Sequence, residues 1–444
     1  MNKWYEKGIF YHIYPLGLTG APKANSDKKP GNGFQELNQW IPHIRSLGCS
    51  AVYIGPLFES SSHGYDTKDY RTVDRRLGTN EDFKKFVSLC HQSEIRVVVD
   101  GVFNHTGREF FAFRDIQEKR DASPYKDWYR GVNFGWGSPL GDSFSYDAWQ
   151  GHFELPCLNL WNPQVKEYLF DTIGGWIQTF DIDGIRLDCA NVLDFDFMRE
   201  LRARTDSMKK DFWLMGEVIH GDYSRWVNDQ MLHSVTNYEL HKSIYSAHND
   251  HNYFEVAHNV KRLEAIGRSL YTFVDNHDED RIASKLLVPE HLYPVYTLLF
   301  TLPGIPSIYY GSEWGIQGKR TKYSDDDLRP ALSIKDQEKL SSPLTKLIRD
   351  LGNTHKEHEE FHGGLYKELL LTNRQYAFAR MGERRAVITA VNNDNSPAIV
   401  SIPLPIHAGS AVNLFDNTAI PVSDQKIQLT IPANRGVIIK ITEE

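Results

Sequence analysis

Cysteine is scarce in this chain, and its placement excludes two kinds of structure. Four cysteines occur among 444 residues, they lie far apart in apolar surroundings, and no Cys-x-x-Cys pair is present. A disulfide framework or a structural zinc site would need cysteines in pairs. We therefore expect reduced thiols in the interior at Cys49, Cys90, Cys157 and Cys189.

Long apolar runs and basic tracts are missing as well. No segment has the roughly 20 consecutive apolar residues of a membrane helix, and the N-terminal MNKWYEKGIFYHIYP lacks the apolar stretch of a signal peptide. Acidic residues outnumber basic ones 58 to 50, which gives a net charge of −8. Membranes and nucleic acids are therefore not expected as partners, and we expect a cytoplasmic protein.

Short β-rich apolar runs alternate with amphipathic segments over much of the chain. The segments 36–48, 80–93 and 162–180 have apolar residues at three- and four-residue spacing, which indicates helices. Eight strands alternating with helices predict a (β/α)8 TIM barrel. The predicted strands are 8–14, 49–57, 95–102, 183–189, 212–218, 234–238, 271–276 and 305–311.

Two segments differ from this alternation, and 444 residues exceed what one hydrophobic core organises. Residues 106–160 are irregular and rich in Gly, Pro and aromatics, which indicates a small domain B inserted after the third strand. Residues 363–444 have alternating apolar and polar positions and predict a C-terminal antiparallel β-sandwich domain. The barrel domain A would then consist of residues 1–105 and 161–362.

Four acids occur at the ends of predicted strands three, four, five and seven: Asp100, Asp188, Glu217 and Asp278. Glu217 ends the apolar run FWLMG with no basic residue beside it, and burying an unpaired carboxylate is costly. In such barrels the reactive groups lie at the C-terminal ends of the strands. We therefore expect the four acids to meet at one mouth.

Two of these acids have different surroundings, as a pair of carboxyl groups with different protonation states requires. Arg186 lies two residues before Asp188, on the same face of a strand, and a guanidinium there keeps Asp188 ionised. Glu217 has no cation in its local sequence, and its apolar approach raises its pKa. Asp188 is thus the predicted nucleophile and Glu217 the predicted acid/base. The alternatives are a structural Arg–Asp pair and a strand-end acid that faces solvent.

Eight motifs resemble conserved regions of glycoside hydrolase family 13, the α-amylase family. They occur in the expected order and spacing, and the resemblance covers the whole chain, with the insertion as domain B and the tail as domain C. The motifs are GIFYHIYP (8–15), HGYDTKDY (63–70), DGVFNHT (100–106), LPCLN (155–159), GIRLDCAN (184–191), GEV (216–218), FVDNHD (273–278) and GIPSIYYGSEWG (304–315).

The resemblance implies further roles. Asp278 would be the third catalytic acid and hold the sugar hydroxyls next to the reacting carbon, with His105 and His277 as uncharged donors. Arg186 is also expected among the substrate-binding residues. Tyr65 would stack under the sugar at the cleavage point. The alternatives are core histidines bonded to backbone carbonyls and a loop aromatic that plugs the barrel mouth.

Residues after strand eight and in domain B give a less specific indication of function. Asp325 and Arg329, four residues apart, resemble an acid and an arginine that hold the next sugar, but they also fit a solvated charge run. The domain B aromatics would either line the cleft or pack internally: Phe134, Trp136, Tyr146 and Trp149.

Asp100 and Asn104 match supporting positions of the family. Asn104 corresponds to a calcium ligand in many α-amylases, but the basic residue and histidine expected after the nucleophile are replaced in the segment 190–192, Ala-Asn-Val. No cofactor is therefore expected to be required, and calcium binding stays open.

The motifs RLDCAN (186–191) and LPCLN look most like the cyclomaltodextrinase, neopullulanase and maltogenic amylase branch. Val192 replaces an acidic residue of that branch, its N-terminal β domain is lacking, and FVDNHDEDR (273–281) looks more like plain α-amylases. The resemblance implies a retaining hydrolase of α-1,4-glucosidic bonds in short maltooligosaccharides or cyclomaltodextrins, as a monomer or homodimer.

Other functions are compatible with parts of the pattern. An α-glucan transglycosylase or a sucrose-type enzyme of the same family would use the same acids. A binding protein with this fold would normally have lost them. A metal-dependent barrel hydrolase would normally have a His-x-His pair on strand one, where only His12 occurs.

Overall fold

The predicted barrel is confirmed. A computed structural model describes residues 3–26 and 29–443, and eight parallel strands form one sheet in the order β10-β9-β8-β5-β2-β1-β12-β11. A bridge between Thr236 and Tyr271 joins the two end strands and closes the barrel. The strands are β1 (Phe10–Ile13), β2 (Ala51–Ile54), β5 (Arg96–Gly101), β8 (Gly184–Leu187), β9 (Trp213–Gly216), β10 (Ser234–Val235), β11 (Tyr271–Thr272) and β12 (Ile305–Tyr309).

The register of the strands aligns their C-terminal ends. Asp100 on β5 pairs with Arg186 on β8, and Arg186 pairs with Met215 on β9. Strands β8 and β9 are fully buried, as expected in a sheet that is covered on both faces. The residues that follow β8 and β9 therefore emerge side by side.

The helices pack around the barrel through their apolar stripes. In α2, buried Phe34, Leu37, Trp40, Ile41 and Ile44 follow the helical period. The helices are α1 (Pro15–Leu18), α2 (Gly33–Ser46), α3 (Asn80–Gln92), α4 (Phe111–Lys119), α5 (Pro163–Phe180), α6 (Phe195–Met208), α7 (Tyr238–Asn249), α8 (Phe254–Arg262), α9 (Ile282–Lys285), α10 (Leu292–Thr301), α11 (Gln337–Leu340), α12 (Pro343–Glu357) and α13 (Glu359–Gly363).

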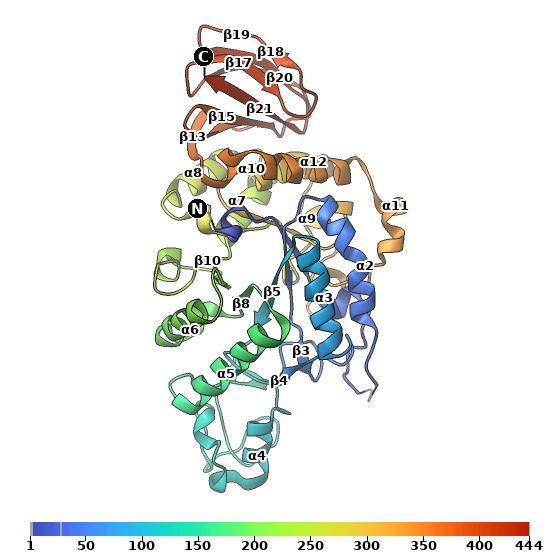
Figure 1. Cartoon of the computed structure of the whole chain (residues 1–444), viewed down its shortest axis with the longest axis vertical. Helices are drawn as coiled ribbons and strands as arrows, with labels where there is room; N and C mark the ends of the chain where they lie inside the picture. Colours follow the sequence, from blue (N-terminus) through green and yellow to red (C-terminus); the bar gives the residue numbers. More distant parts are fainter. Residues whose placement is uncertain (1–2, 27–28, 444) are drawn as a thin grey trace.

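The segment 106–160 contains α4 and a short hairpin, β6 (Ala148–Trp149) and β7 (His152–Pro156), and α4 lies at one end of the molecule's long axis (Figure 1). Its own aromatic cluster holds it together: Phe113 contacts Tyr129, Phe144 and Tyr146. A second hairpin, β3 (Phe58–Ser60) and β4 (Thr67–Val73), follows β2.

The C-terminal strands form two antiparallel sheets at the other end of the long axis (Figure 1), in the orders β13-β14-β15-β21-β17-β18 and β16-β20-β19. Buried Ile388, Ile402, Ile427 and Ile439 form their common core, which confirms the sandwich. The strands are β13 (Leu365–Leu371), β14 (Gln375–Met381), β15 (Arg385–Asn392), β16 (Ala398–Pro403), β17 (Ala408–Asn413), β18 (Ala419–Ile420), β19 (Val422–Ser423), β20 (Lys426–Ile431) and β21 (Arg435–Glu443). The domain limits after residues 105, 160 and 362 stay our proposal.

The structure bears on the expectations about cysteines and about long apolar helices. All four cysteines are unpaired and buried, as predicted. Within residues 3–26 and 29–443, no helix combines the length and the apolar character that crossing a membrane requires.

Candidate active site

One guanidinium at the barrel mouth holds three carboxylates. Arg186 Nη1 lies 2.9 Å from an oxygen of Asp100 and 2.9 Å from an oxygen of Asp188, and its Nη2 lies 3.0 Å from Glu217 Oε1. The three acids come from the ends of β5, β8 and β9, so the predicted convergence of these acids is observed. The Tyr53 hydroxyl donates a further hydrogen bond of 2.9 Å to Asp100.

Two glycines allow these strand ends to approach so closely. A Cβ at Gly55 would lie 2.3 Å from the Asp100 Cβ, and one at Gly216 would lie 2.7 Å from the Ala190 Cβ. Larger residues at either position would push apart the strand ends that carry the acids.

The two acids predicted to react lie close to one another. Single ligand atoms of Asp188, Cys189 and Glu217 lie within 4.8 Å of one another. Cys189 connects the acids, because its thiol lies 3.0 Å from Asp188 Oδ2 and its backbone N–H donates to Glu217 Oε2 at 3.1 Å. Cys189 itself has a φ of 50°, a left-handed conformation that is strained for a residue with a side chain.

Burial raises the pKa of Glu217 to about 7. Arg186 opposes this rise, whereas the charges of Asp188 and Asp278 add to it. Glu217 has no cation in its local sequence, but across the strands Arg186 contacts it at 3.0 Å. The pKa of Glu217 rises as expected, because burial is the largest effect and the opposing guanidinium is shared among three acids.

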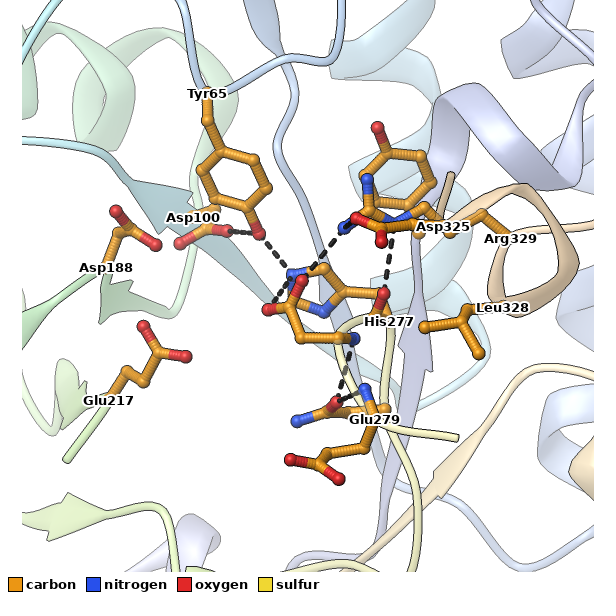
Figure 2. Close-up of polar contacts among 12 residues, drawn as sticks. Tyr65, Asp100, Asp188, Glu217, His277, Glu279, Asp325, Leu328 and Arg329 are labelled. Atoms are coloured by element: carbon orange, nitrogen blue, oxygen red, sulfur yellow. Dashed lines mark hydrogen bonds and ion pairs between the residues drawn. The ribbon is translucent and has the colours of Figure 1, made fainter. Parts of the chain in front are cut away.

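The third acid has different neighbours. Asp278 lies 2.8 Å from Arg329 Nη2 and 3.0 Å from His277 Nε2. Burial opposes its ionisation, but His277, Arg329 and Arg186 together lower its pKa. Arg329 also contacts Asp325 at 3.2 Å and donates to the His277 carbonyl at 2.9 Å. Figure 2 shows His277, Asp325 and Arg329 on one side of the site and Asp188 and Glu217 on the other.

Tyr65 lies between these two groups. Its ring stacks on His277 with centroids 5.7 Å apart, and its hydroxyl donates to Asp100 at 3.2 Å and contacts His277 Nε2 (Figure 2). His105 is buried, which lowers its pKa to about 3, so the ring is neutral near pH 7. Its Nε2 has no hydrogen-bond partner among the described residues. This free nitrogen is suited to a sugar hydroxyl.

A cavity of about 580 Å³ joins these groups. Two predicted substrate-binding residues, Arg186 and His277, do not line this cavity. Both are buried and contact acids that do line it, and Asp100 is buried with them. The predicted residues that line the cavity are Tyr65, His105, Asp188, Glu217, Asp278, Asp325 and Arg329. Of the four domain B aromatics, Trp149 lines the cavity and stacks on His105, whereas Tyr146 is buried in the domain B cluster. Phe134 packs on Phe144, and Trp136 is exposed.

Several lining residues were not identified as site residues from the sequence, among them Cys189, Tyr238 and Tyr323. Cys189 and Tyr238 contact the reactive acids, the latter through a 3.4 Å hydrogen bond to Glu217. Both follow the ends of barrel strands, which is the available sequence signal. Tyr323 is 88% exposed at the rim, and nothing in its local sequence marks it.

Asn104 is not part of this cavity, and the residues around it do not fit calcium. It lines a separate pocket of about 360 Å³ together with Arg130, a cation, and Asp194. Calcium takes six to eight oxygen ligands. Asp194, the one acid in this lining, already accepts hydrogen bonds from Trp161 and from the backbone of Phe197. Within the described residues, the sole group of three or more potential metal ligands is Asp188, Cys189 and Glu217, whose two acids bind Arg186.

Comparison with known proteins agrees with this geometry. A family model described as the α-amylase catalytic domain matches residues 24–355, most of the chain. The chain belongs to the α-amylase family of glycoside hydrolases. The resemblance found in the motifs is thereby confirmed.

Relatives of this α-amylase family member carry names from the expected branch. It is 30% identical to a cyclomaltodextrinase of Thermoanaerobacter pseudethanolicus, over 90% of this chain and 72% of the relative. It is 28% identical to an intracellular maltogenic amylase of Bacillus subtilis, over 90% of this chain and 71% of the relative. A solved cyclomaltodextrinase structure superposes with a TM-score of 0.87 at 26% identity, over 99% of this chain and 78% of that chain.

Proposed function

We propose that this family member cleaves α-1,4-glucosidic bonds by double displacement, with Asp188 as nucleophile and Glu217 as acid/base. The proximity of the two carboxyl groups carries the proposal. Their nearest ligand atoms are within 4.8 Å, which suits the roughly 5 Å of retaining enzymes and not the roughly 6.5–9.5 Å of inverting ones.

In the first step a carboxylate oxygen of Asp188 attacks the anomeric carbon, and the bond to the leaving oxygen breaks. The leaving oxygen takes the proton of Glu217, whose raised pKa keeps this proton available near neutral pH. In the second step Glu217, now ionised, takes a proton from water while the water oxygen displaces Asp188 from the anomeric carbon. Two inversions restore the α-configuration.

Three other groups hold the sugar in this scheme. Asp278 stays ionised because its pKa is lowered, and it accepts hydrogen bonds from sugar hydroxyls. Neutral His105 donates or accepts without adding charge next to the positive charge that develops on the ring. Tyr65 presents its ring at the cavity wall.

The substrates we propose are short maltooligosaccharides, with cyclomaltodextrins as secondary substrates. Relatives named cyclomaltodextrinase and maltogenic amylase support this choice. A sugar hydroxyl that replaces water in the second step would give transglycosylation, the alternative within the family. We further propose a cytoplasmic monomer or homodimer, and the relative named intracellular supports that location.

The test combines product analysis with anomer detection. Maltotriose, maltoheptaose, cyclodextrin, pullulan, sucrose and insoluble starch are supplied separately, and proton NMR records the first product. We expect maltooligosaccharides to be cleaved fastest, with the α-anomer appearing first. The β-anomer appearing first would reject the mechanism, and faster turnover of starch than of maltoheptaose would reject the substrate proposal.

A further inference from the structure

A second cavity lies directly beside the catalytic one. It has a volume of about 440 Å³, within the range of ligand pockets. Tyr14, Ala21, Ser62 and Ala331 are among the residues that line it but not the catalytic cavity. Four residues line both cavities and therefore form the wall between them: Lys23, His63, Asp326 and Arg329.

The outer part of this wall is an ion pair between Lys23 and Asp326, residues far apart in the sequence. Both side chains are largely exposed, at 81% and 59%. The backbone beneath Lys23 is anchored, because Arg76 Nη1 donates to the carbonyls of Pro22 and Lys23 at 2.8 and 3.1 Å. Opening the outer part of the wall therefore requires only these two exposed side chains to rotate, while the backbone beneath Lys23 stays in place.

The second cavity lies on the side of the sugar that the enzyme retains. Glu217 protonates the leaving oxygen, so the leaving part of the substrate lies toward Glu217. Arg329, in the shared wall, contacts Asp278 and lies across the site from Glu217 (Figure 2). A glucan that extends beyond the Asp278 end therefore points at the Lys23–Asp326 pair.

We propose that the Lys23–Asp326 pair is a gate, and that the second cavity receives further glucosyl units at the non-reducing end of longer linear maltooligosaccharides. The inference rests on the proposed function and specifies its substrate length. The second cavity has a mixed apolar and polar lining, which includes Tyr14, Ala21 and Ser62 and is typical of ligand pockets. When the ion pair is formed, the second cavity is closed off, so only a short part of the substrate fits on the non-reducing side of the cleavage point.

The Lys23–Asp326 ion pair is weak enough to open, and the effect of removing it is large enough to measure. Exposed ion pairs contribute about 0–1 kcal/mol, which corresponds to at most about a fivefold preference for the closed state. Lys23→Ala should therefore raise the ratio of kcat/KM for maltoheptaose to kcat/KM for maltotriose by about two- to fivefold. Asp326→Asn removes the other charge of the pair and should raise the same ratio by a similar factor.

The matched control is Lys346→Ala. Lys346 forms an exposed pair with Asp350 at 2.6 Å, on α12, and lines neither cavity. This variant should leave the ratio at the wild-type value. Reducing-end-labelled maltoheptaose adds a second measurement, since an open gate moves the main cleavage point farther from the non-reducing end.

Filling the second cavity tests whether the cavity itself takes the sugar. Ala331 is exposed at its wall, so Ala331→Trp should fold, lower the ratio in the wild-type background, and abolish the gain in Lys23→Ala. An unchanged ratio in both gate variants, or a gain that survives Ala331→Trp, overturns the inference. Absence of maltotriose turnover in the wild type would instead reject the proposed function.

Discussion

Glu217 and Asp278 face the same cavity, yet their acidities move in opposite directions. Burial disfavours the charged form of both. At Glu217 one guanidinium, that of Arg186, is divided among three carboxylates, and the pKa rises to about 7. At Asp278 the side chain contacts both Arg329 and His277, and the pKa falls.

The difference shows that the charged and hydrogen-bonding partners of each carboxylate, and not burial alone, sort these acids into roles. Glu217 shares the Arg186 guanidinium with two other acids, whereas Asp278 contacts both Arg329 and His277. The same sorting by environment separates the two carboxyls of other retaining glycosidases. Changing single partners at either end should therefore change one role and leave the other.

The largest effect is expected for Asp188→Asn. The amide cannot form the covalent intermediate, so turnover should fall below about one thousandth of the wild-type rate, a small part of the at least about 10⁶-fold acceleration typical of enzymes. Maltotriose binding, measured by calorimetry, should persist because the rest of the cavity is unchanged. A variant within tenfold of the wild-type rate would exclude Asp188 as nucleophile.

Glu217→Gln should remove the proton donor and lower kcat by about 10²- to 10⁴-fold. In the wild type the acid must be protonated, so kcat/KM should decline as pH rises through about 7, the pKa of Glu217 in the free protein. This alkaline limb should disappear in Glu217→Gln, whose residual rate no longer depends on that group. A limb that survives at the same pH assigns the titration to another residue.

Arg329→Gln removes a cation from the other end of the cavity. A hydrogen bond to a charged group contributes about 1.5–3 kcal/mol, so kcat/KM should fall by about tenfold to a hundredfold. Arg329 lowers the pKa of Asp278, so its loss raises that pKa, and activity should begin to fail at higher pH on the acidic side. Arg320→Gln is the control for this acidic shift, because Arg320 forms its ion pair with Asp325 at 3.0 Å, and the acidic limb should stay at the wild-type pH.

Local patterns predict much of this site. The apolar runs predict the eight strands, and parallel strands bring their C-terminal ends together, so Asp188 and Glu217 could be placed at one mouth from the sequence. Contacts between strands could not be predicted, because the Arg186–Glu217 pair depends on the register of β8 against β9. Residues adjacent in the sequence can also line different cavities: His105 lines the catalytic cavity, whereas Asn104 lines another one.

The Lys23–Asp326 contact could not be predicted from local sequence patterns. It joins residues 303 positions apart, and both belong to exposed polar segments whose local sequence fits a solvated charge run equally well. Asp325 and Arg329 had the same two interpretations from the sequence. Only the three-dimensional arrangement shows that these charges line a cavity.

The smallest effect is expected at Cys189, between the two reactive acids. Burial raises the pKa of its thiol, so the sulfur keeps its proton and can donate it to Asp188 Oδ2 at 3.0 Å. A thiol is a weak donor, and a loss near 1 kcal/mol corresponds to about a fivefold change. Cys189→Ala should therefore lower kcat/KM by about two- to fivefold, whereas Cys189→Ser keeps a donor and should stay closer to wild type.

Both variants keep the backbone N–H that binds Glu217, so the alkaline limb near pH 7 should not move. Equal losses in the two variants would show that the position contributes through packing and not through the hydrogen bond to Asp188.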